Sequence, residues 1–367
     1  MKDFLDFASG SIQQVGLSFF MSCILPAGVF ALIQAFVLIP LTARNVPALT
    51  GLGLSATPPT LPNSLDLSGL LAFVLVPLAL GVLLLGMNSF LIRLYSGFVW
   101  PLNILLRSRT QLKRQQIMHR YGVLNDYRAE YQANVAALSR NRFSNEADLQ
   151  QLKDNIQQIE NAIRTEHERI DTDSMNTADN TNNAALPKNS ADAAPTRLGN
   201  VLAVTAEYAA EHYGIDAATF WPRLYPLLQK AAPEHYERIG SQKASLDLSL
   251  NLSFLSTVVA LEAALILVIS ILSGIRSDVP LILLIGIGGA LLAIIFYDNC
   301  VSAAHNLGKL IAVSFDFYRG LILTAFNLQI PGDLHAEYAL WIALAAFVRR
   351  AEPFYFPARS VSAADVK

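Results

Sequence analysis

Residues 245–300 read SLDLSLNLSFLSTVVALEAALILVISILSGIRSDVPLILLIGIGGALLAIIFYDNC. In this stretch two apolar runs, 252–275 and 281–296, flank a short polar turn. The hydrocarbon core of a bilayer is about 30 Å thick and needs about 20 helical residues, and only helices or closed barrels satisfy their backbone polar groups there. We therefore expect two helices, at 245–275 and 279–300, that cross a membrane and return.

The composition indicates that the apolar residues gather in segments, because 53% of the residues are hydrophobic while the middle of the chain is polar. Two earlier apolar segments predict further spans, so the fold class is an all-α integral membrane protein with four transmembrane helices. Prolines such as Pro62 exclude regular structure from the loop between the first two spans. The expected segments of this half are an interfacial helix at 1–14, spans at 15–43 and 69–92, and a loop at 44–68.

Charge and cysteine content exclude several function classes. The formal net charge is −2, which argues against nucleic-acid binding, because that needs a basic surplus. Cys23 and Cys300 show no CxxC or metal spacing and are interpreted as small apolar packing residues. We expect no cofactor and no metal.

The distribution of lysine and arginine predicts the orientation. Basic residues follow the second and fourth spans and precede the third, whereas the two opposite loops carry only Arg44 and Arg276. By the positive-inside rule both termini and the middle region are cytoplasmic, and the protein crosses a cell's inner (plasma) membrane several times. The residues on the cytoplasmic side are Arg93, Arg107, Arg109, Lys113, Arg114, Arg238, Lys243, Lys309 and Arg319.

The middle region predicts a cytoplasmic helical hairpin at 93–170, with a single bent helix as the alternative. Its second arm shows apolar residues at alternating steps of three and four, a coiled-coil-like spacing. Residues 171–195 are rich in Asp, Asn, Thr and Ala and are expected to be a disordered linker. The candidate interaction seam consists of Leu149, Leu152, Ile156, Ile159 and Ile163.

A compact helical unit is expected at 196–244. Its segments Arg197-Leu-Gly-Asn200, Tyr213-Gly-Ile-Asp216 and Phe220-Trp-Pro-Arg-Leu224 resemble a pattern in uncharacterised bacterial integral membrane proteins, a resemblance that implies no function. Pro222 and Pro226 predict a kinked or short second helix in this unit. The remaining expected segments are a cytoplasmic extension of the fourth helix at 301–330, an amphipathic helix at 331–352 and a flexible tail at 353–367.

Glu262 interrupts the third span near its middle. An ionised carboxylate at that depth costs about 2.5–3.5 kcal/mol on insertion scales, so it must be protonated, paired or facing water. One interpretation is a pore-lining or proton-sensing group, repeated around the axis of an oligomer. The other is a neutral acid that holds the bundle together through a hydrogen bond to Gln34 or Asn88.

A second set of polar residues lies at the end of the fourth span. Steps of four, three and four place these side chains on one helical face. They fit a charged ring at the inner mouth of a pore, but the interpretation that the sequence favours is an ordinary helix exit in contact with water and headgroups. The residues are Asp298, Ser302, His305 and Lys309.

The sequence contains no Walker, HExxH, CxxC or GxSxG motif, so we expect no enzyme. We expect an oligomeric, channel-like or pore-like membrane component that its cytoplasmic helices gate or assemble. The alternative is a membrane-anchored scaffold or signalling protein that recruits a cytoplasmic partner through the hairpin. In both cases the expected partners are the lipid bilayer and further copies of the chain.

Overall fold

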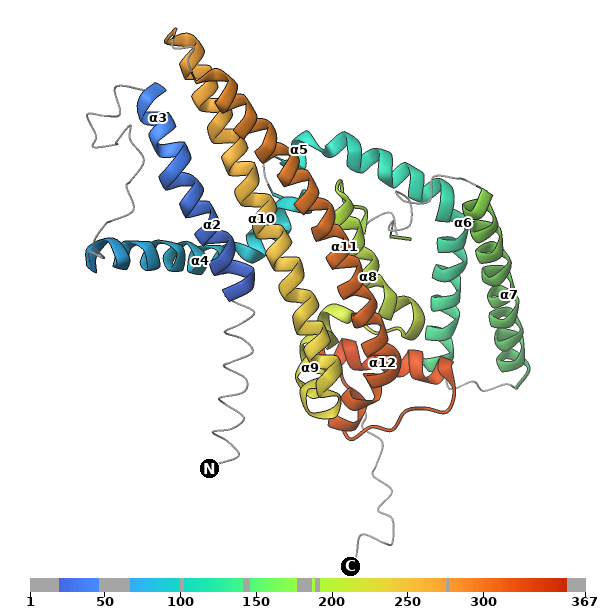
Figure 1. Cartoon of the computed structure of the whole chain (residues 1–367). Coiled ribbons are helices and arrows are strands. Elements are labelled where there is room, and N and C mark those ends of the chain that lie inside the picture. Colours follow the sequence, from blue (N-terminus) through green and yellow to red (C-terminus); the bar gives the residue numbers. More distant parts are fainter. Residues whose placement is uncertain are drawn as a thin grey trace, which may run out of the picture. The chain divides into compact units, whose positions relative to one another are not determined.

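The computed structural model of the chain describes residues 20–45, 67–99, 102–140, 146–176, 187–188, 192–274 and 278–354. Most of these residues lie in helices, and none of them lies in a strand (Figure 1). Along the chain the elements are η1 (Phe20–Ile24), α2 (Leu25–Ile33), η2 (Gln34–Leu38), α3 (Ile39–Asn45), α4 (Leu67–Tyr95), α5 (Leu102–Leu105), α6 (Arg107–Arg140), α7 (Glu146–Asn176), α8 (Arg197–Tyr213), α9 (Ala217–Ala231), α10 (Pro233–Leu272), α11 (Val279–Ala325) and α12 (Leu334–Arg350).

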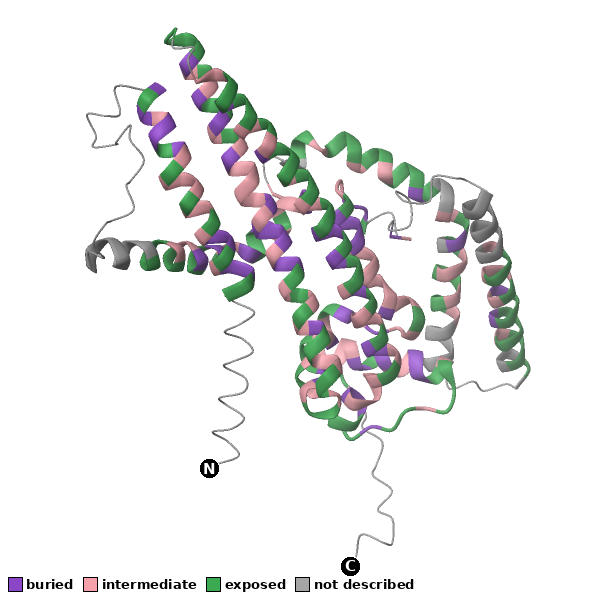
Figure 2. Ribbon diagram, viewed as in Figure 1, coloured by how far each residue is buried: buried purple, intermediate pink, exposed green. Residues whose placement is uncertain are grey.

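Four helical stretches are long and apolar enough to cross a membrane: residues 20–45, Val74–Tyr95 of α4, α10 and α11. This confirms the predicted all-helical fold with four such helices, and the chain is a multi-pass membrane protein. At most 28% of the residues in the most apolar window of each helix are buried. Figure 2 shows many exposed residues along α4 and α11, and scattered exposed residues on α10. This apolar surface needs lipid or other subunits to cover it.

The chain divides into two compact units. The membrane unit comprises residues 1–94 and 240–304, and the second unit comprises 95–239 and 305–367. α10 and α11 each run without a break from one unit into the other, and for α11 the sequence predicted an extension beyond the span. The predicted interfacial helix at 1–14 lies outside the described residues, as do most of the loop at 44–68 and of the tail at 353–367.

Small residues bring the spans of the membrane unit close together. A Cβ added to Gly289 of α11 would lie 3.1 Å from the carbonyl oxygen of Ser256 and from the amide nitrogen of Ala260, both on α10. A Cβ added to Gly81 of α4 would lie 3.1 Å from Ile24 of the first span. Without side chains at these points the backbones can approach closely, which is a common packing device in membranes.

The second unit has its own aromatic core. The rings of Phe220 on α9 and Trp341 on α12 meet edge to face with their centroids 5.2 Å apart, and both side chains are fully buried. α12, the predicted C-terminal amphipathic helix, contacts α6, α8 and α9. Pro222 and Pro226 lie inside α9, which continues to Ala231, so it is not the short helix that was one of the two expectations. The buried core is completed by Ala209, Ile215, Leu224, Leu228, Ile239, Phe315, Ile322, Leu323 and Leu344.

Short side chains cap α8 and α9 in this unit. The Thr196 side chain accepts a hydrogen bond from the amide of Gly199 and caps α8, and Asp216 caps α9 in the same way. Gly214 ends α8 at φ 72°, and a Cβ there would lie 3.0 Å from the ring of Tyr338. Both the left-handed backbone and the neighbouring ring therefore favour glycine at this position.

The predicted interaction seam lies within the chain. α6 and α7 run side by side (Figure 1). Ile156 of the seam packs with Tyr131 of α6 and Tyr338 of α12, and Ile159 is also buried. The side chain of Leu149 lies outside the described residues. α7 continues to Asn176, into the stretch predicted to be a disordered linker, and residues 177–186 lie outside the described residues.

Candidate functional site

Glu262 is held by a residue of the first span. The side-chain amide of Gln34 donates a hydrogen bond to Glu262 Oε2 over 2.5 Å. Gln34 is one of the two partners that the sequence suggested for Glu262. The other, Asn88 of α4, is buried, and its Oδ1 has no hydrogen-bond partner among the described residues.

Three more hydrogen bonds join the first span to the third span and the turn that follows it. Near one end of the membrane unit, Asn251 Nδ2 donates to the backbone oxygen of Ser22 over 2.8 Å. Near the other end, Ser270 Oγ donates to Asn45 Oδ1 over 3.0 Å, and Asn45 Nδ2 donates to Asp278 Oδ2 over 3.2 Å.

We call these contacts of Asn251, Glu262 and Ser270 the polar ladder. At 1.5 Å per residue its levels lie about 16 Å and 12 Å apart along α10. Polar side chains within membrane helices are rare and commonly mark pathways or helix contacts. The ladder therefore places polar contacts at three different depths of the interface between the first span and α10.

Two π-helical segments of the first span coincide with the ladder. η1 contains Ser22, whose carbonyl accepts from Asn251, and η2 begins at Gln34, which donates to Glu262. A π-helical turn widens the backbone and frees carbonyl groups from the regular hydrogen-bond pattern, and such turns occur frequently at functional sites. The first span is thus distorted at two levels where it meets polar side chains of α10.

The end of the ladder near Asp247 carries buried oxygens without donors. Asp247 is 8% exposed and Asn251 is 0% exposed, and the two lie one turn apart on α10. Oδ1 of each has no hydrogen-bond partner among the described residues. Lys243 Nζ lies 2.6 Å from the other oxygen of Asp247. A buried acceptor without a donor costs about 1–3 kcal/mol, so a hydrogen-bond donor at these oxygens would be stabilising.

The predicted set at the end of the fourth span lies on the exposed surface of α11. Asp298, Ser302, His305 and Lys309 are all exposed. Ser302 Oγ donates to the backbone oxygen of Asp298 over 3.1 Å, a contact within the helix. These side chains consequently face water, lipid or another subunit rather than the core of this chain.

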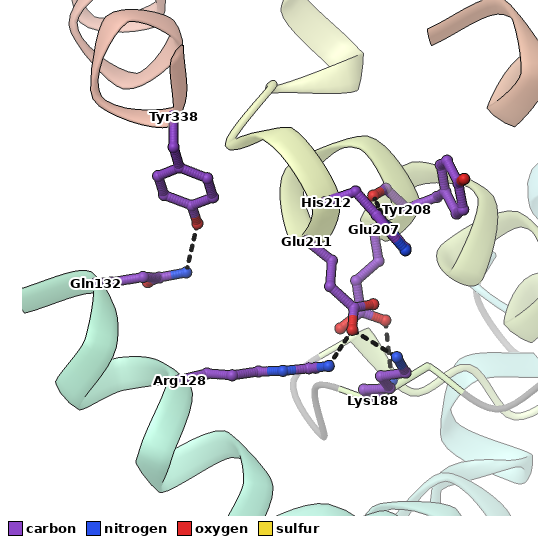
Figure 3. Close-up of polar contacts among 8 residues, drawn as sticks. All are labelled: Arg128, Gln132, Lys188, Glu207, Tyr208, Glu211, His212 and Tyr338. Atoms are coloured by element: carbon purple, nitrogen blue, oxygen red, sulfur yellow. Dashed lines mark hydrogen bonds and ion pairs between the residues drawn. The ribbon is translucent and has the colours of Figure 1, made fainter. Parts of the chain in front are cut away.

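The second unit contains an open groove of about 1570 Å³. One wall is α6, with Arg107 and Met118, and the other is α8, with the small residues Ala203 and Ala206. Figure 3 shows Arg128 of α6 reaching across to Glu211 of α8. Lys188 Nζ lies 2.5 Å from the same Glu211 oxygen. Polar contacts therefore bridge a groove whose α8 wall is mainly small and apolar.

The charges around Glu211 set its protonation. Burial by itself would raise the pKa of the Glu211 carboxyl, but the positive charges of Lys188 and Arg128 outweigh burial and lower that pKa. At the end of the groove, Gln132 Nε2 donates to the Tyr338 hydroxyl over 3.0 Å (Figure 3). Nearby, the Tyr131 hydroxyl lies 2.6 Å from His335 Nδ1, and His335 Nε2 lies 3.1 Å from Glu160. These contacts fasten α12 to α6 and α7.

Within the described residues no group of three or more His, Cys, Asp or Glu side chains could hold a metal ion. No protein-family model matches the chain, and no similar protein was found among the curated proteins or the solved structures. The resemblance of residues 196–228 to uncharacterised bacterial membrane proteins therefore stays a prediction.

Sequence reasoning missed the two ends of the polar ladder. Nothing in the sequence showed that Asn251 meets Ser22, although Asp247 and Asn251 are one helical turn apart. The contact of Asn45 with Ser270 joins residues 225 positions apart. A polar residue within each of two apolar segments is the signal that could have suggested these pairs.

Proposed function

We propose that the protein is a non-enzymatic, homo-oligomeric membrane component that carries cations, foremost protons, across a cell's inner membrane. Its N- and C-termini and its second unit lie in the cytoplasm, in agreement with the distribution of basic residues. The polar ladder is the observation that supports this function. It combines an intramembrane acid, Glu262, with a buried acid at one end, Asp247.

Protons fit this arrangement better than larger ions. A carboxyl group that is hydrogen-bonded to an amide can take up and release a proton in place, whereas a hydrated metal ion needs a wide aqueous pore. The levels of the polar ladder lie about 16 Å and 12 Å apart along α10, which is farther than one hydrogen bond reaches. Water molecules must therefore enter between the levels to carry protons from one to the next. The two π-helical segments of the first span are the points at which such opening is easiest.

Assembly is supported by the surface of the membrane unit. Only 11% of the most apolar window of α11 is buried within the chain, and the exposed set from Asp298 to Lys309 lies farther along the same helix. Further copies would cover part of this surface and bring the polar set of each copy around an axis. Because α10 and α11 continue into the second unit, movement of that unit would reach the ladder directly and gate it.

The scaffold alternative has less support, because its proposed recruiting surface is occupied. Ile156 is buried against α6 and α12, and Ile159 is also buried, so a partner would have to displace these contacts. Binding a partner through α7 would therefore first require the α6–α7 pair to separate. Partner capture that survives removal of the α7 seam would need another surface.

The test is proton flux into proteoliposomes that contain a pH-sensitive dye and carry a potassium diffusion potential. We expect the native protein to acidify the lumen, and Glu262→Gln and Asn251→Ala to slow acidification about tenfold or more, a loss equivalent to about 1.4 kcal/mol in the barrier. Leu265→Ala is the matched control, because Leu265 is exposed on the same helix, and it should leave the rate unchanged. Undiminished flux in both ladder variants, or no flux in the native oligomer at any voltage or pH, would refute the proposal.

A further inference from the structure

The segment that follows the second span is largely exposed, although one side of α6 lines the groove of the second unit. From Ile104 to Met118 the only buried residue is Ile117. Four large apolar side chains in this segment are more than half exposed: Ile104 (61%), Leu105 (69%), Leu112 (59%) and Met118 (62%). Single exposed apolar residues are ordinary, but four within four turns need a covering surface.

The same segment is strongly basic. No acidic residue occurs between Asp66 and Asp126, whereas Arg107, Arg109, Lys113 and Arg114 fall within two turns of α6. The three arginines are exposed. Helices that carry exposed apolar side chains beside arginine and lysine bind at the interface of anionic bilayers, where the apolar groups enter the acyl boundary and the cations meet headgroups.

Chain connectivity keeps this segment near a membrane. α4, one of the four apolar helices, ends at Tyr95, and α5 begins at Leu102. Seven residue steps of at most about 3.6 Å limit the separation of these two ends to about 25 Å. A lipid surface is therefore within reach of α5 whatever the arrangement of the two units.

We propose that α5 and the first turns of α6, residues 102–118, form an interfacial surface that binds the headgroups of anionic phospholipids in the bilayer that the spans cross. Leu105, Leu112 and neighbouring apolar side chains enter the lipid, and Arg107, Arg109 and Arg114 contact phosphate groups. This surface does not depend on ion transport. A second copy of the chain is the competing occupant that the experiment must separate from lipid.

The two native cysteines make a direct test possible. Cys23 and Cys300 are buried, so a cysteine introduced at Leu112 can be labelled selectively with a fluorophore whose emission shifts to the blue in apolar surroundings. The full chain, one copy per nanodisc, is placed in discs of phosphatidylcholine alone or with one quarter phosphatidylglycerol. We expect a blue shift with phosphatidylglycerol and quenching by nitroxide-labelled lipids. Lys153→Cys on the exposed face of α7 is the matched control and should show water-like emission in both discs.

The arginines supply the second arm of the test. Each basic residue near an anionic surface strengthens attachment about fivefold at low ionic strength, so replacing all three arginines with glutamine should weaken it on the order of 100-fold. The blue shift at position 112 should then be lost, and 0.5 M salt should reduce it in the parent. Water-like emission in both kinds of disc, or a shift that appears only with two copies per disc, would overturn the proposal.

Discussion

Replacing Glu337 with glutamine should destabilise the second unit, because the side chain holds a buried charge. Glu337 is 3% exposed, and its carboxylate accepts hydrogen bonds from Arg319 Nε over 2.6 Å and from Arg319 Nη2 over 3.2 Å. Trp341 Nε1 donates to the same group over 3.1 Å. The substitution keeps the shape and one acceptor but removes the charge that faces Arg319.

The expected loss in the free energy of unfolding depends on the contacts that Arg319 keeps in the variant. Removing one partner of a buried ion pair costs about 3–5 kcal/mol. Arg319 keeps 20% side-chain exposure, a position 4.1 Å above the ring of Tyr213 and a hydrogen bond to the backbone oxygen of Asp316, which reduce the penalty. We therefore expect a loss of about 2–3 kcal/mol in the free energy of unfolding, which is below that range.

The measurement is thermal unfolding of the full chain in detergent, followed by tryptophan emission. Trp221 and Trp341 both lie in or against the core of the second unit, so their emission reports on its unfolding. For a unit of this size the loss corresponds to a fall in Tm of about 5–10 °C. Glu352→Gln is the matched control, since its pair with Arg350 is exposed, and exposed pairs contribute about 0–1 kcal/mol.

The pH dependence gives a second check. Burial alone would raise the pKa of Glu337, but the hydrogen bonds from Arg319 and Trp341 and the charge of Arg319 outweigh it and lower that pKa in the folded protein. A lowered folded pKa stabilises above the unfolded value of about 4.3, and the contribution is lost as pH falls through the folded pKa. The difference in Tm between the native protein and the Glu337→Gln variant should therefore become smaller below about pH 4. Equal Tm values for the variant and the native protein at pH 7, or a difference in Tm that grows in acid, would refute the reasoning.

Two further predictions concern packing in the second unit. Gly214→Ala should lower the free energy of unfolding by about 1–3 kcal/mol, because Gly214 has a φ of 72° and lies against the Tyr338 ring, and this loss is measured as a lower Tm. Gly122→Ala is the control and should not lower the Tm, because a Cβ there meets nothing within 4 Å. Ile156→Ala should cost about 2–4 kcal/mol locally and speed hydrogen exchange in α7, and equal exchange rates in variant and native protein would contradict the packing described here.

The apolar periodicity of the sequence was enough to predict an all-helical fold with four membrane helices. The continuation of α11 beyond the membrane segment was also predictable, because no proline interrupts 298–326. The sequence alone shows which residues share one face of a helix. It does not show which residues of two different helices meet.

The residues that pair across the structure show this limit. Gln34 and Asn88 were equally good partners for Glu262 in the sequence, and only the register of the first span against α10 selects Gln34. Arg319 and Glu337 stand on opposite sides of the break at Pro331-Gly332, so their separation in the sequence did not suggest a contact. Such choices depend on the packing of side chains from distant segments, which periodicity does not encode.

The 228 residues that separate Gln34 from Glu262 have a consequence for biosynthesis. At about 5–20 residues per second, the ribosome needs about 10–45 s after translating Gln34 before it reaches Glu262. During this interval the first hydrophobic segment must reside in the membrane without its eventual neighbour. The mean hydropathy of this segment is 2.3, which is high enough for it to remain in the membrane as a single helix.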